Sequence, residues 1–436
     1  METVIQRTVE LLSLEPLCDY CLGRQFARLG YGLSNRERGR SLKIALLMEA
    51  VKQENQQLIR LLAERGGLDE AVQQLMRENI ATEKQPCGLC RGMLSEEKFK
   101  EVAERVADHV TQYEFETFLI GATVPADIRE KEDRLRSHVG VVEGEDLKND
   151  ITRGVGRFFT TITGKRPEYI SPDITIIVNL FTNTFKILPN PLFIKGRYLK
   201  HSRNLPQSPW RCRKCWGRGC EQCGFTGREY PTSVAELVGE PAKKLFEAQG
   251  FKFHAAGRED VDALVEDGGR PFVLELKRPR KRLIPLKEVE KTINSETGGL
   301  VEVMLESLAS RKDVRTLKLA SPKVSKTYVV RALYEKEVDI GQLKEIEEKF
   351  RNIVIAQRTP TRVLERRADK VRKKIVYETE AKLVSGREAF FKIRCQGGLY
   401  VKELVTGDGG RTSPSFAEVL QQVPLRIELT VVSVEA

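Results

Sequence analysis

Gly257-Arg258-Glu259-Asp260-Val261-Asp262 is the most informative stretch of this sequence. It follows the segment 251–254 and is predicted to form a loop. Three later segments add a tyrosine, an arginine cluster and a lysine in a fixed order. They are Lys326-Thr327-Tyr328, the basic stretch 357–369, and Cys395-Gln396-Gly397-Gly398-Leu399-Tyr400-Val401-Lys402-Glu403-Leu404. These segments hold the candidate site residues of the chain.

Residues 229–436, which hold all of these segments, are predicted to form one α/β domain. The expected elements are strands at 328–334, 390–395 and 425–432 and helices at 241–249 and 342–350. The first helix would have Pro241 at its opening position, where proline is tolerated. Because strands outnumber helices, we expect a mixed, largely antiparallel sheet.

The part of the chain before residue 208 divides into two regions of different character. Residues 1–94 have apolar residues at helical spacing, and residues 95–207 mix helical and strand patterns. The expected elements are helices at 3–12, 35–63 and 148–161 and strands at 173–180, 184–188 and 191–200. The fold class predicted for the whole chain is therefore α+β with several domains.

Eight of the 9 cysteines occur in CxxC pairs, and in a reducing compartment such pairs indicate zinc before disulfides. The pairs that bracket the helical region 1–94 would close one structural site of four thiolates, with no open position for catalysis. The pairs in the linker 208–228 would form a compact knuckle, and the sequence leaves open whether it holds zinc. The two sets are Cys18, Cys21, Cys87 and Cys90, and Cys212, Cys215, Cys220 and Cys223.

The charge balance suggests a polyanionic partner. Among 436 residues, 73 Lys and Arg exceed 62 Asp and Glu, so the net charge is +11. A highly charged soluble surface would fit the same numbers. No secretion signal is visible, and the longest apolar run, 174–181, is far shorter than the roughly 20 residues that span a bilayer. We therefore expect a cytoplasmic protein with no membrane partner.

These motifs together resemble the THUMP-bearing archaeal-type tRNA pseudouridine synthases, which modify the T-loop of tRNA, and the resemblance spans most of the chain. It implies that residues 229–436 are the catalytic domain and that residues 95–207 are a THUMP-like RNA-binding domain. It also implies that tRNA is the partner and that uridines 54 and 55 of tRNA are the targets. Catalysis would need no cofactor, and the protein would be a monomer.

The resemblance assigns the chemistry to one carboxylate. Pseudouridine formation needs a carboxylate nucleophile and a uridine that is extruded from its stack. The family's arginine-x-aspartate element matches at Arg258 and Asp260, so Asp260 would attack, and Arg258 would extrude the base or hold a phosphate. Asp262 is the competing local choice for the nucleophile.

Four further residues would bind the target nucleotide. Tyr328 would stack against the uracil and help deprotonate C5. Lys402 would pair with the catalytic carboxylate and keep it ionised, although family members often have arginine there. Val401 and Leu429 resemble the apolar walls of the pocket, and ordinary core packing would explain Leu429 equally well.

Two basic segments are predicted to contact the RNA backbone. One is the arginine-rich stretch 358–374, which includes Arg362, Arg366 and Arg367. The other runs from the expected strand 191–200 into the residues after it and offers Lys195, Arg197, Lys200 and Arg203 as phosphate contacts. A solvated charged edge is the competing interpretation of any one of these residues.

Two other functions compete with this interpretation. Asp262, Glu275 and Lys277 fit the D…ExK pattern of a Mg²⁺-dependent nuclease, in which the carboxylates hold the metal. That short pattern leaves Tyr328 and Lys402 unexplained. A non-catalytic RNA-binding protein with zinc modules and a THUMP-like domain is the second alternative. In such a protein, replacement of Asp260 would cause no loss of function.

Overall fold

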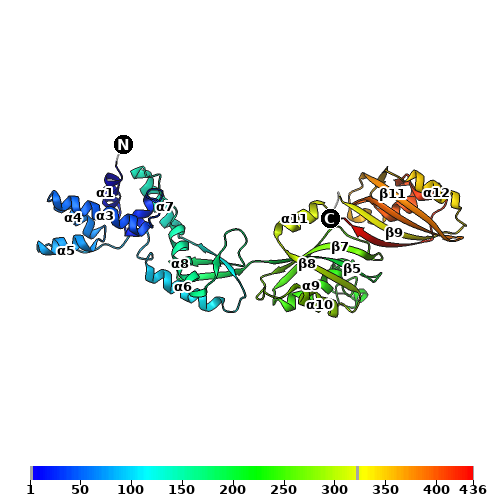
Figure 1. Cartoon of the computed structure of the whole chain (residues 1–436), viewed down its shortest axis with the longest axis horizontal. Coiled ribbons are helices and arrows are strands. Elements are labelled where there is room, and N and C mark those ends of the chain that lie inside the picture. The colour runs from blue at the N-terminus through cyan, green and yellow to red at the C-terminus, as the bar shows by residue number, and fades with distance from the viewer. Residues whose placement is uncertain (1–2, 321–323, 436) are drawn as a thin grey trace. The chain divides into compact units, whose positions relative to one another are not determined.

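The chain divides into two compact units, Met1–Asn190 and Pro191–Ala436, which we call the N-terminal and C-terminal units (Figure 1). The computed structural model describes residues 3–320 and 324–435, apart from the side chain of Arg366. Among the described residues, no helix is both long enough and apolar enough to cross a bilayer.

The N-terminal unit begins with a group of short helices. They are α1 (Val4–Leu14), α2 (Asp19–Gln25), α3 (Asn35–Lys52), α4 (Gln56–Glu64) and α5 (Asp69–Arg77). Residues 35–63, which we expected to be helical, form α3 and α4, and the chain turns between these two helices. Glu54 adopts a left-handed conformation with φ of 53°, and the Asn55 side chain then caps α4 by accepting from the amide of Leu58.

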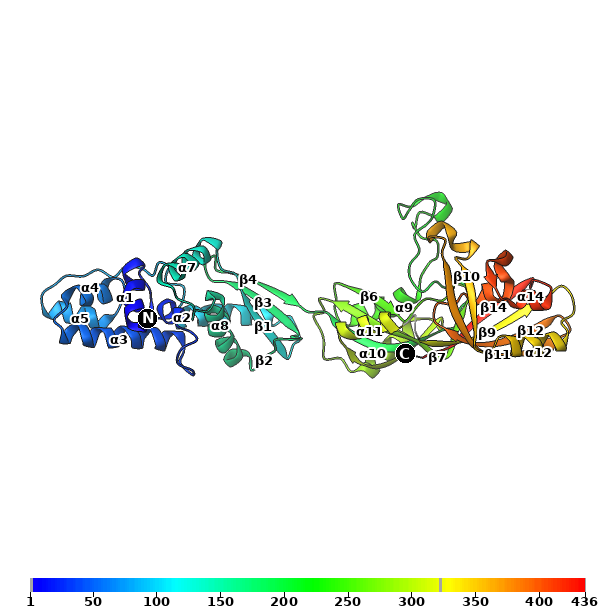
Figure 2. The ribbon, with the colours of Figure 1, turned by 90° about the horizontal axis from the view of Figure 1, so that it is seen from above.

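An α/β part completes the N-terminal unit. Its elements are α6 (Glu96–Val110), β1 (Thr117–Ala122), α7 (Ala126–Val139), α8 (Leu147–Thr163), β2 (Arg166–Pro167), β3 (Ile174–Asn179) and β4 (Thr184–Pro189). The sheet order is β2-β1-β3-β4, with β3 and β4 antiparallel as their sequence pattern predicted. These strands lie beside α8 (Figure 2). One continuous hydrophobic core joins the helical and α/β parts, so they form a single unit.

The C-terminal unit is built on a ten-stranded, largely antiparallel sheet with the order β13-β10-β11-β12-β9-β14-β7-β5-β8, and β6 pairs with β7. Its strands are β5 (Leu192–Lys200), β6 (Gly250–Ala255), β7 (Leu264–Lys277), β8 (Val301–Ala309), β9 (Ser325–Leu333), β10 (Ile353–Arg358), β11 (Val371–Ser385), β12 (Glu388–Gln396), β13 (Thr412–Ser413) and β14 (Arg426–Val434). The expected strands are present, and the mixed-sheet α+β fold class is confirmed.

Helices cover both faces of this sheet. They are α9 (Val234–Leu245), α10 (Leu286–Glu296), α11 (Arg311–Ala320), α12 (Ile340–Lys349), α13 (Val401–Thr406) and α14 (Phe416–Leu420). Figure 1 shows α9 and α10 on one side of β5, β7 and β8 and α11 on the other. We expected a helix that opens at Pro241, but α9 begins seven residues earlier because Ser233 caps it, and Pro241 lies inside the helix.

The strand at 191–200 belongs to a different part of the protein than we expected. We placed it in the THUMP-like region 95–207, but β5 pairs with β7 and β8 in the C-terminal sheet. Its alternating apolar residues fill the core of that sheet, where Ile194 and Tyr198 are fully buried. The boundary between the units therefore falls near residue 190 rather than 207.

Two glycines of α8 provide a matched test of packing in the N-terminal unit. A Cβ on Gly154 would lie 2.4 Å from the buried ring of Phe99, whereas a Cβ on Gly156 would meet only an ordinary contact at 3.8 Å from Ile120. We expect Gly154→Ala to destabilise this unit by about 1–3 kcal/mol. Gly156→Ala should stabilise it by about 0.5–1 kcal/mol, because alanine is the better helix former.

Thermal and urea unfolding of both variants beside the wild type would measure these effects. Equal changes of the same sign in the free energy of unfolding of the two variants would contradict the close approach of α6 and α8.

Candidate active site

Asp260 lies in the loop between β6 and β7, and an arginine from a distant segment binds its carboxylate. Arg362 belongs to the short 3-10 helix η2 (Thr361–Arg366), and its Nη1 donates to Asp260 Oδ1 at 2.9 Å. Its Nε donates to Oε1 of buried Glu403 at 2.6 Å. Burial lowers the pKa of Arg362, but Glu403 and Asp260 outweigh that effect and raise it. The guanidinium thus remains charged and bridges the two carboxylates.

Lys402 contacts both aspartates of the loop but lies closer to Asp262. Its Nζ donates to both carboxylate oxygens of Asp262 at 2.7 Å and stands 3.8 Å from Asp260 Oδ2. Partial burial raises the pKa of Asp262, but the bond from Lys402 outweighs this and lowers it. Sequence reasoning named Lys402 as the partner of Asp260, whereas the structure gives the direct hydrogen bond to Arg362.

A buried glutamine fixes the start of the helix that carries Lys402 and Glu403. Gln357, on β10, donates to the carbonyl of Tyr400 at 2.9 Å and accepts from the amide of Tyr400 at 2.8 Å. This pair of bonds holds the residue that precedes α13, so Lys402 and Glu403 point at their two partners from the first turn. Sequence reasoning missed Gln357 and Glu403, because a polar residue inside a strand or next to a lysine gives no local signal of its partner.

The predicted apolar residues of the site lie in the core around this charge cluster. Tyr328, on β9, is 9% exposed, and Val401 and Leu429 are 4% and 6% exposed. Burial, with a further contribution from nearby Cys395, raises the pKa of Tyr328, so its hydroxyl stays protonated. All three residues belong to the same hydrophobic cluster of the C-terminal unit.

The arginines predicted to contact RNA have different surroundings. Arg258 is exposed and stacks over the ring of Trp210 at 5.0 Å. Arg367 donates to the hydroxyl of Tyr400 at 2.9 Å, beside the start of α13. The side chain of Arg366 lies outside the described part of the chain, so its prediction has no structural counterpart here.

Lys195 and Arg197 lie on the opposite face of β5 from the residues that reach the loop of Asp260. Successive residues of a strand point to opposite faces, so Arg197 faces away from Tyr198 and Lys200. Arg197 donates to the carbonyls of Gly268 and Val434, each at 2.8 Å. These two cations are therefore not brought together with Asp260.

Lys200 has an internal role, which corrects its prediction as a phosphate contact. Its side chain is fully buried, and its Nζ donates to the carbonyls of Leu205, Asp260 and Val261 at 2.8, 3.3 and 2.8 Å. Burial lowers its pKa to about 8, although the negative charge of Glu259 acts to raise it. The two-residue period of β5 puts Lys200 on the buried face with Tyr198, and this pattern could have revealed its role.

Arg203 supports the same loop from its outer side. Its Nη1 donates to the carbonyl of Asp262 at 2.9 Å and to that of Leu429 at 3.3 Å. Two cations that were predicted to bind phosphate therefore bind the backbone on either side of Asp260 and Asp262. The position of the candidate nucleophile is determined by these backbone bonds as well as by Arg362.

The nuclease pattern is not assembled. Val265 lies opposite Lys200 on β5, and Glu275 lies opposite Phe193, seven residues further along the strand. At about 3.3 Å per residue this separates Glu275 from the start of β7, near Asp262, by roughly 23 Å. Glu275 instead pairs with His254 at 2.9 Å. The carboxylates of the D…ExK pattern thus cannot share a metal ion.

Both cysteine sets converge. Within each set the four sulfur atoms lie within 4.8 Å of one another. In the knuckle, three sulfur–sulfur distances are 3.9, 3.9 and 3.7 Å. A tetrahedral zinc with bonds of about 2.3 Å would need edges of about 3.8 Å, so the donor set fits this metal. Gly217 and Gly219 have φ of 95° and 92°, which explains the glycines between the pairs.

The first cysteine set, Cys18, Cys21, Cys87 and Cys90, is connected to the α/β part of the N-terminal unit. Cys21 and Cys90 are fully buried, and buried Arg24 donates to Cys21 Sγ at 3.5 Å. The same guanidinium pairs with Glu132 of α7 at 2.8 Å and with Asp150 of α8 at 3.0 Å. A cation beside the sulfurs favours thiolates, so this network supports metal ligation and links it to the neighbouring fold.

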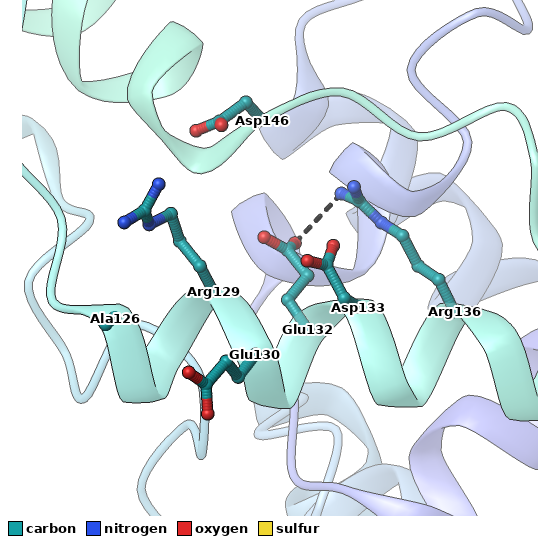
Figure 3. A pocket seen from close by; sticks show the side chains of 7 residues that line it. All are labelled: Ala126, Arg129, Glu130, Glu132, Asp133, Arg136 and Asp146. Carbon is teal, nitrogen blue, oxygen red and sulfur yellow. Dashed lines mark hydrogen bonds and ion pairs between the residues drawn. The ribbon is translucent and has the colours of Figure 1, made fainter.

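A pocket of about 360 Å³ lies along α7 in the N-terminal unit (Figure 3). Acidic side chains outnumber basic ones in its lining, which makes it unsuited to RNA phosphates. Glu132, one of its lining residues, is already bound by Arg136 at 3.0 Å. The pocket contains none of the predicted site residues, and its lining is Ala126, Arg129, Glu130, Glu132, Asp133, Arg136 and Asp146.

Comparisons with known proteins agree with this division of the chain. Family models described as "Pus10, C-terminal" and "Pus10 THUMP domain, archaeal" match residues 193–435 and 102–179. The tRNA pseudouridine synthase Pus10 of Thermofilum pendens is 43% identical over 431 residues, which cover 98% of this chain and 94% of that protein. The protein of the same name from Methanopyrus kandleri is 41% identical over 422 residues, with 96% and 95% covered. The C-terminal match begins inside β5, as expected from the pairing of that strand.

Removal of the Lys200 ammonium should weaken the C-terminal unit. We expect Lys200→Met to destabilise it by about 2–4 kcal/mol, because buried carbonyls around Asp260 lose their charged donor. Urea unfolding would measure the change. Lys252→Met, at an exposed position of β6, is the matched control and should stay within about 0.5 kcal/mol of the wild type. Equal stability of the two variants would contradict the internal role of Lys200.

Proposed function

The chain belongs to the Pus10 family of tRNA pseudouridine synthases, and from this membership we propose that it acts on the T-loop uridines at tRNA positions 54 and 55, with Asp260 as the nucleophile. The broader activity, isomerisation of uridine to pseudouridine in tRNA, rests on relatives that match nearly the full chain. The T-loop targets and the residue roles are the proposal, and the geometry around Asp260 supports them.

The single observation that carries the assignment is the bond from Arg362 to Asp260. Isomerisation breaks the C1′–N1 bond of uridine and rejoins the base through C5, so it needs an ionised carboxylate held in one orientation. Arg362 fixes one oxygen of Asp260 at 2.9 Å, while 28% of the side chain stays accessible to a substrate. Asp262 has both oxygens occupied by Lys402, which makes it the poorer nucleophile.

The residues around Asp260 can receive an extruded uridine. Tyr328, Val401 and Leu429 would supply the aromatic face and the apolar walls of the base pocket. Arg258 and Arg367 would contact the phosphates on either side, and Arg362 would orient the nucleophile rather than grip the backbone. The N-terminal unit, with its THUMP match, would hold the body of the tRNA.

Replacement of the nucleophile should abolish turnover while the fold is kept. Tritium release from tRNA labelled at uridine C5, measured in EDTA, should fall by about 10³-fold or more in Asp260→Asn. Asp262→Asn is the matched control and should retain activity within about 10-fold of the wild type. Full activity of Asp260→Asn would overturn the assignment, and strand cleavage that appears on addition of Mg²⁺ would revive the nuclease.

The same assay tests the targets. Transcripts with cytidine at position 54 or at position 55 should each retain part of the release, whereas a transcript with cytidine at both should give none. Release from the doubly substituted transcript would show that the targets lie elsewhere in the tRNA and leave the role of Asp260 intact.

We further propose that both cysteine sets hold structural zinc. The sulfur geometry supports this assignment, and so do amide hydrogens directed at the sulfurs, as in Gly219 to Cys215 and Gly227 to Cys223, both at 3.2 Å. Zinc with four thiolates would stabilise the fold at each site and take no part in the reaction.

Loss of one cysteine pair should remove one metal ion. Elemental analysis should find two zinc ions per wild-type chain and one in Cys87→Ser/Cys90→Ser, which should also unfold at a lower temperature because its site lies in the core. Cys395→Ala, which changes the lone cysteine, should keep both ions. A wild-type protein without zinc after refolding in its presence would refute the proposal.

A further inference from the structure

Glu259, which directly precedes the proposed nucleophile, points into the protein while its neighbours point outward. Its side chain is fully buried, whereas Arg258 is exposed and Asp260 is partly exposed. A buried carboxylate in a surface loop is costly unless charged or polar partners surround it. Its contacts therefore show what holds the loop in place.

Three side chains from separate segments bind the Glu259 carboxylate. The Tyr198 hydroxyl, from β5, lies 2.9 Å from each oxygen. Gln207 Nε2 donates at 3.1 Å and also binds the carbonyl of Gly257 at 3.0 Å. Arg270 Nε, from β7, lies 2.9 Å from Oε2. The loop of Asp260 is thus anchored to two central strands and to the segment that follows β5.

Arg270 also binds the backbone at the start of the loop. It is fully buried, and its Nη1 donates to the carbonyl of Ala256 at 2.9 Å, at the start of the loop. Burial lowers the pKa of Arg270, but Glu259, Tyr198 and Tyr328 together raise it. One guanidinium therefore interacts with the residue beside Asp260 and with the backbone at the start of the same loop.

We propose that Glu259 is a positioning residue, which sets the place of Asp260 relative to the sheet through its buried ion pair with Arg270. The inference rests on the proposed function, since it assumes that Asp260 attacks. A buried ion pair seldom adds net stability over a well-packed apolar pair, whereas it can enforce one geometry. Misplacement of a reacting group by about 1 Å can cost 100-fold in rate.

The test compares rate with affinity. In Glu259→Gln the amide lacks the charge that Arg270 requires, and we expect the single-turnover rate to fall by about 10–100-fold. The Kd for tRNA should change less than about 2-fold, because Glu259 has no contact with solvent. Leu343→Ala, a core change in α12, is the matched control, since it should lower the Tm and leave the rate unchanged well below that Tm.

Two further variants distinguish a positioning role of Glu259 from an effect on folding. They remain informative even if Glu259→Gln folds poorly. Glu259→Gln/Arg270→Met removes both charges and should regain stability without regaining the rate. Tyr198→Phe keeps the ion pair and should lose less than about 10-fold in rate. A wild-type rate in the double variant, or a loss in Glu259→Gln that matches Leu343→Ala at equal stability, would overturn the proposal.

Failure of the positioning role can be distinguished from failure of the proposed function. An active Asp260→Asn would remove the nucleophile assignment whatever Glu259 does. An inactive Asp260→Asn beside a fully active Glu259→Gln would reject the positioning role alone.

Discussion

Charges buried behind the loop between β6 and β7 hold the candidate active site in place. Lys200 holds the carbonyls of Asp260 and Val261, and Glu259 is bound by Arg270 and Tyr198. A loop on its own would sample many conformations, at a cost of about 1–2 kcal/mol per ordered residue. Here the cost is offset by bonds made in a low-dielectric interior, where each bond is strong and an unpaired buried group is costly.

On the solvent side of the same loop, charges of alternating sign set the orientation of the side chains. Arg362 bridges Asp260 and Glu403, while Lys402 donates to the carboxylate of Asp262. These partners come from η2 and from the first turn of α13, which lie far apart in the sequence. The site is preorganised because each charge has a partner before any substrate arrives. Its two aspartates are distinguished by how many of their oxygens remain available.

In the N-terminal unit, a buried cluster of cysteines and charged side chains likewise joins distant segments. Four sulfurs converge in its core, and Arg24 joins them to α7 and α8 through Glu132 and Asp150. A metal held there would couple the helical part to the α/β part. The close approach of α6 and α8 at Gly154 extends this packing to the sheet.

The fold class and the convergence of the cysteine pairs could be predicted from local periodicity and motif spacing, and the family resemblance supplied the segments that lie around Asp260. The sequence could not assign partners across long separations. Lys200 and Arg203 read as phosphate contacts and proved to be donors to backbone carbonyls, and β5 was placed in the wrong unit. Whether a charged side chain faces solvent or the interior depends on which strand lies beside it, and only the tertiary structure decides that.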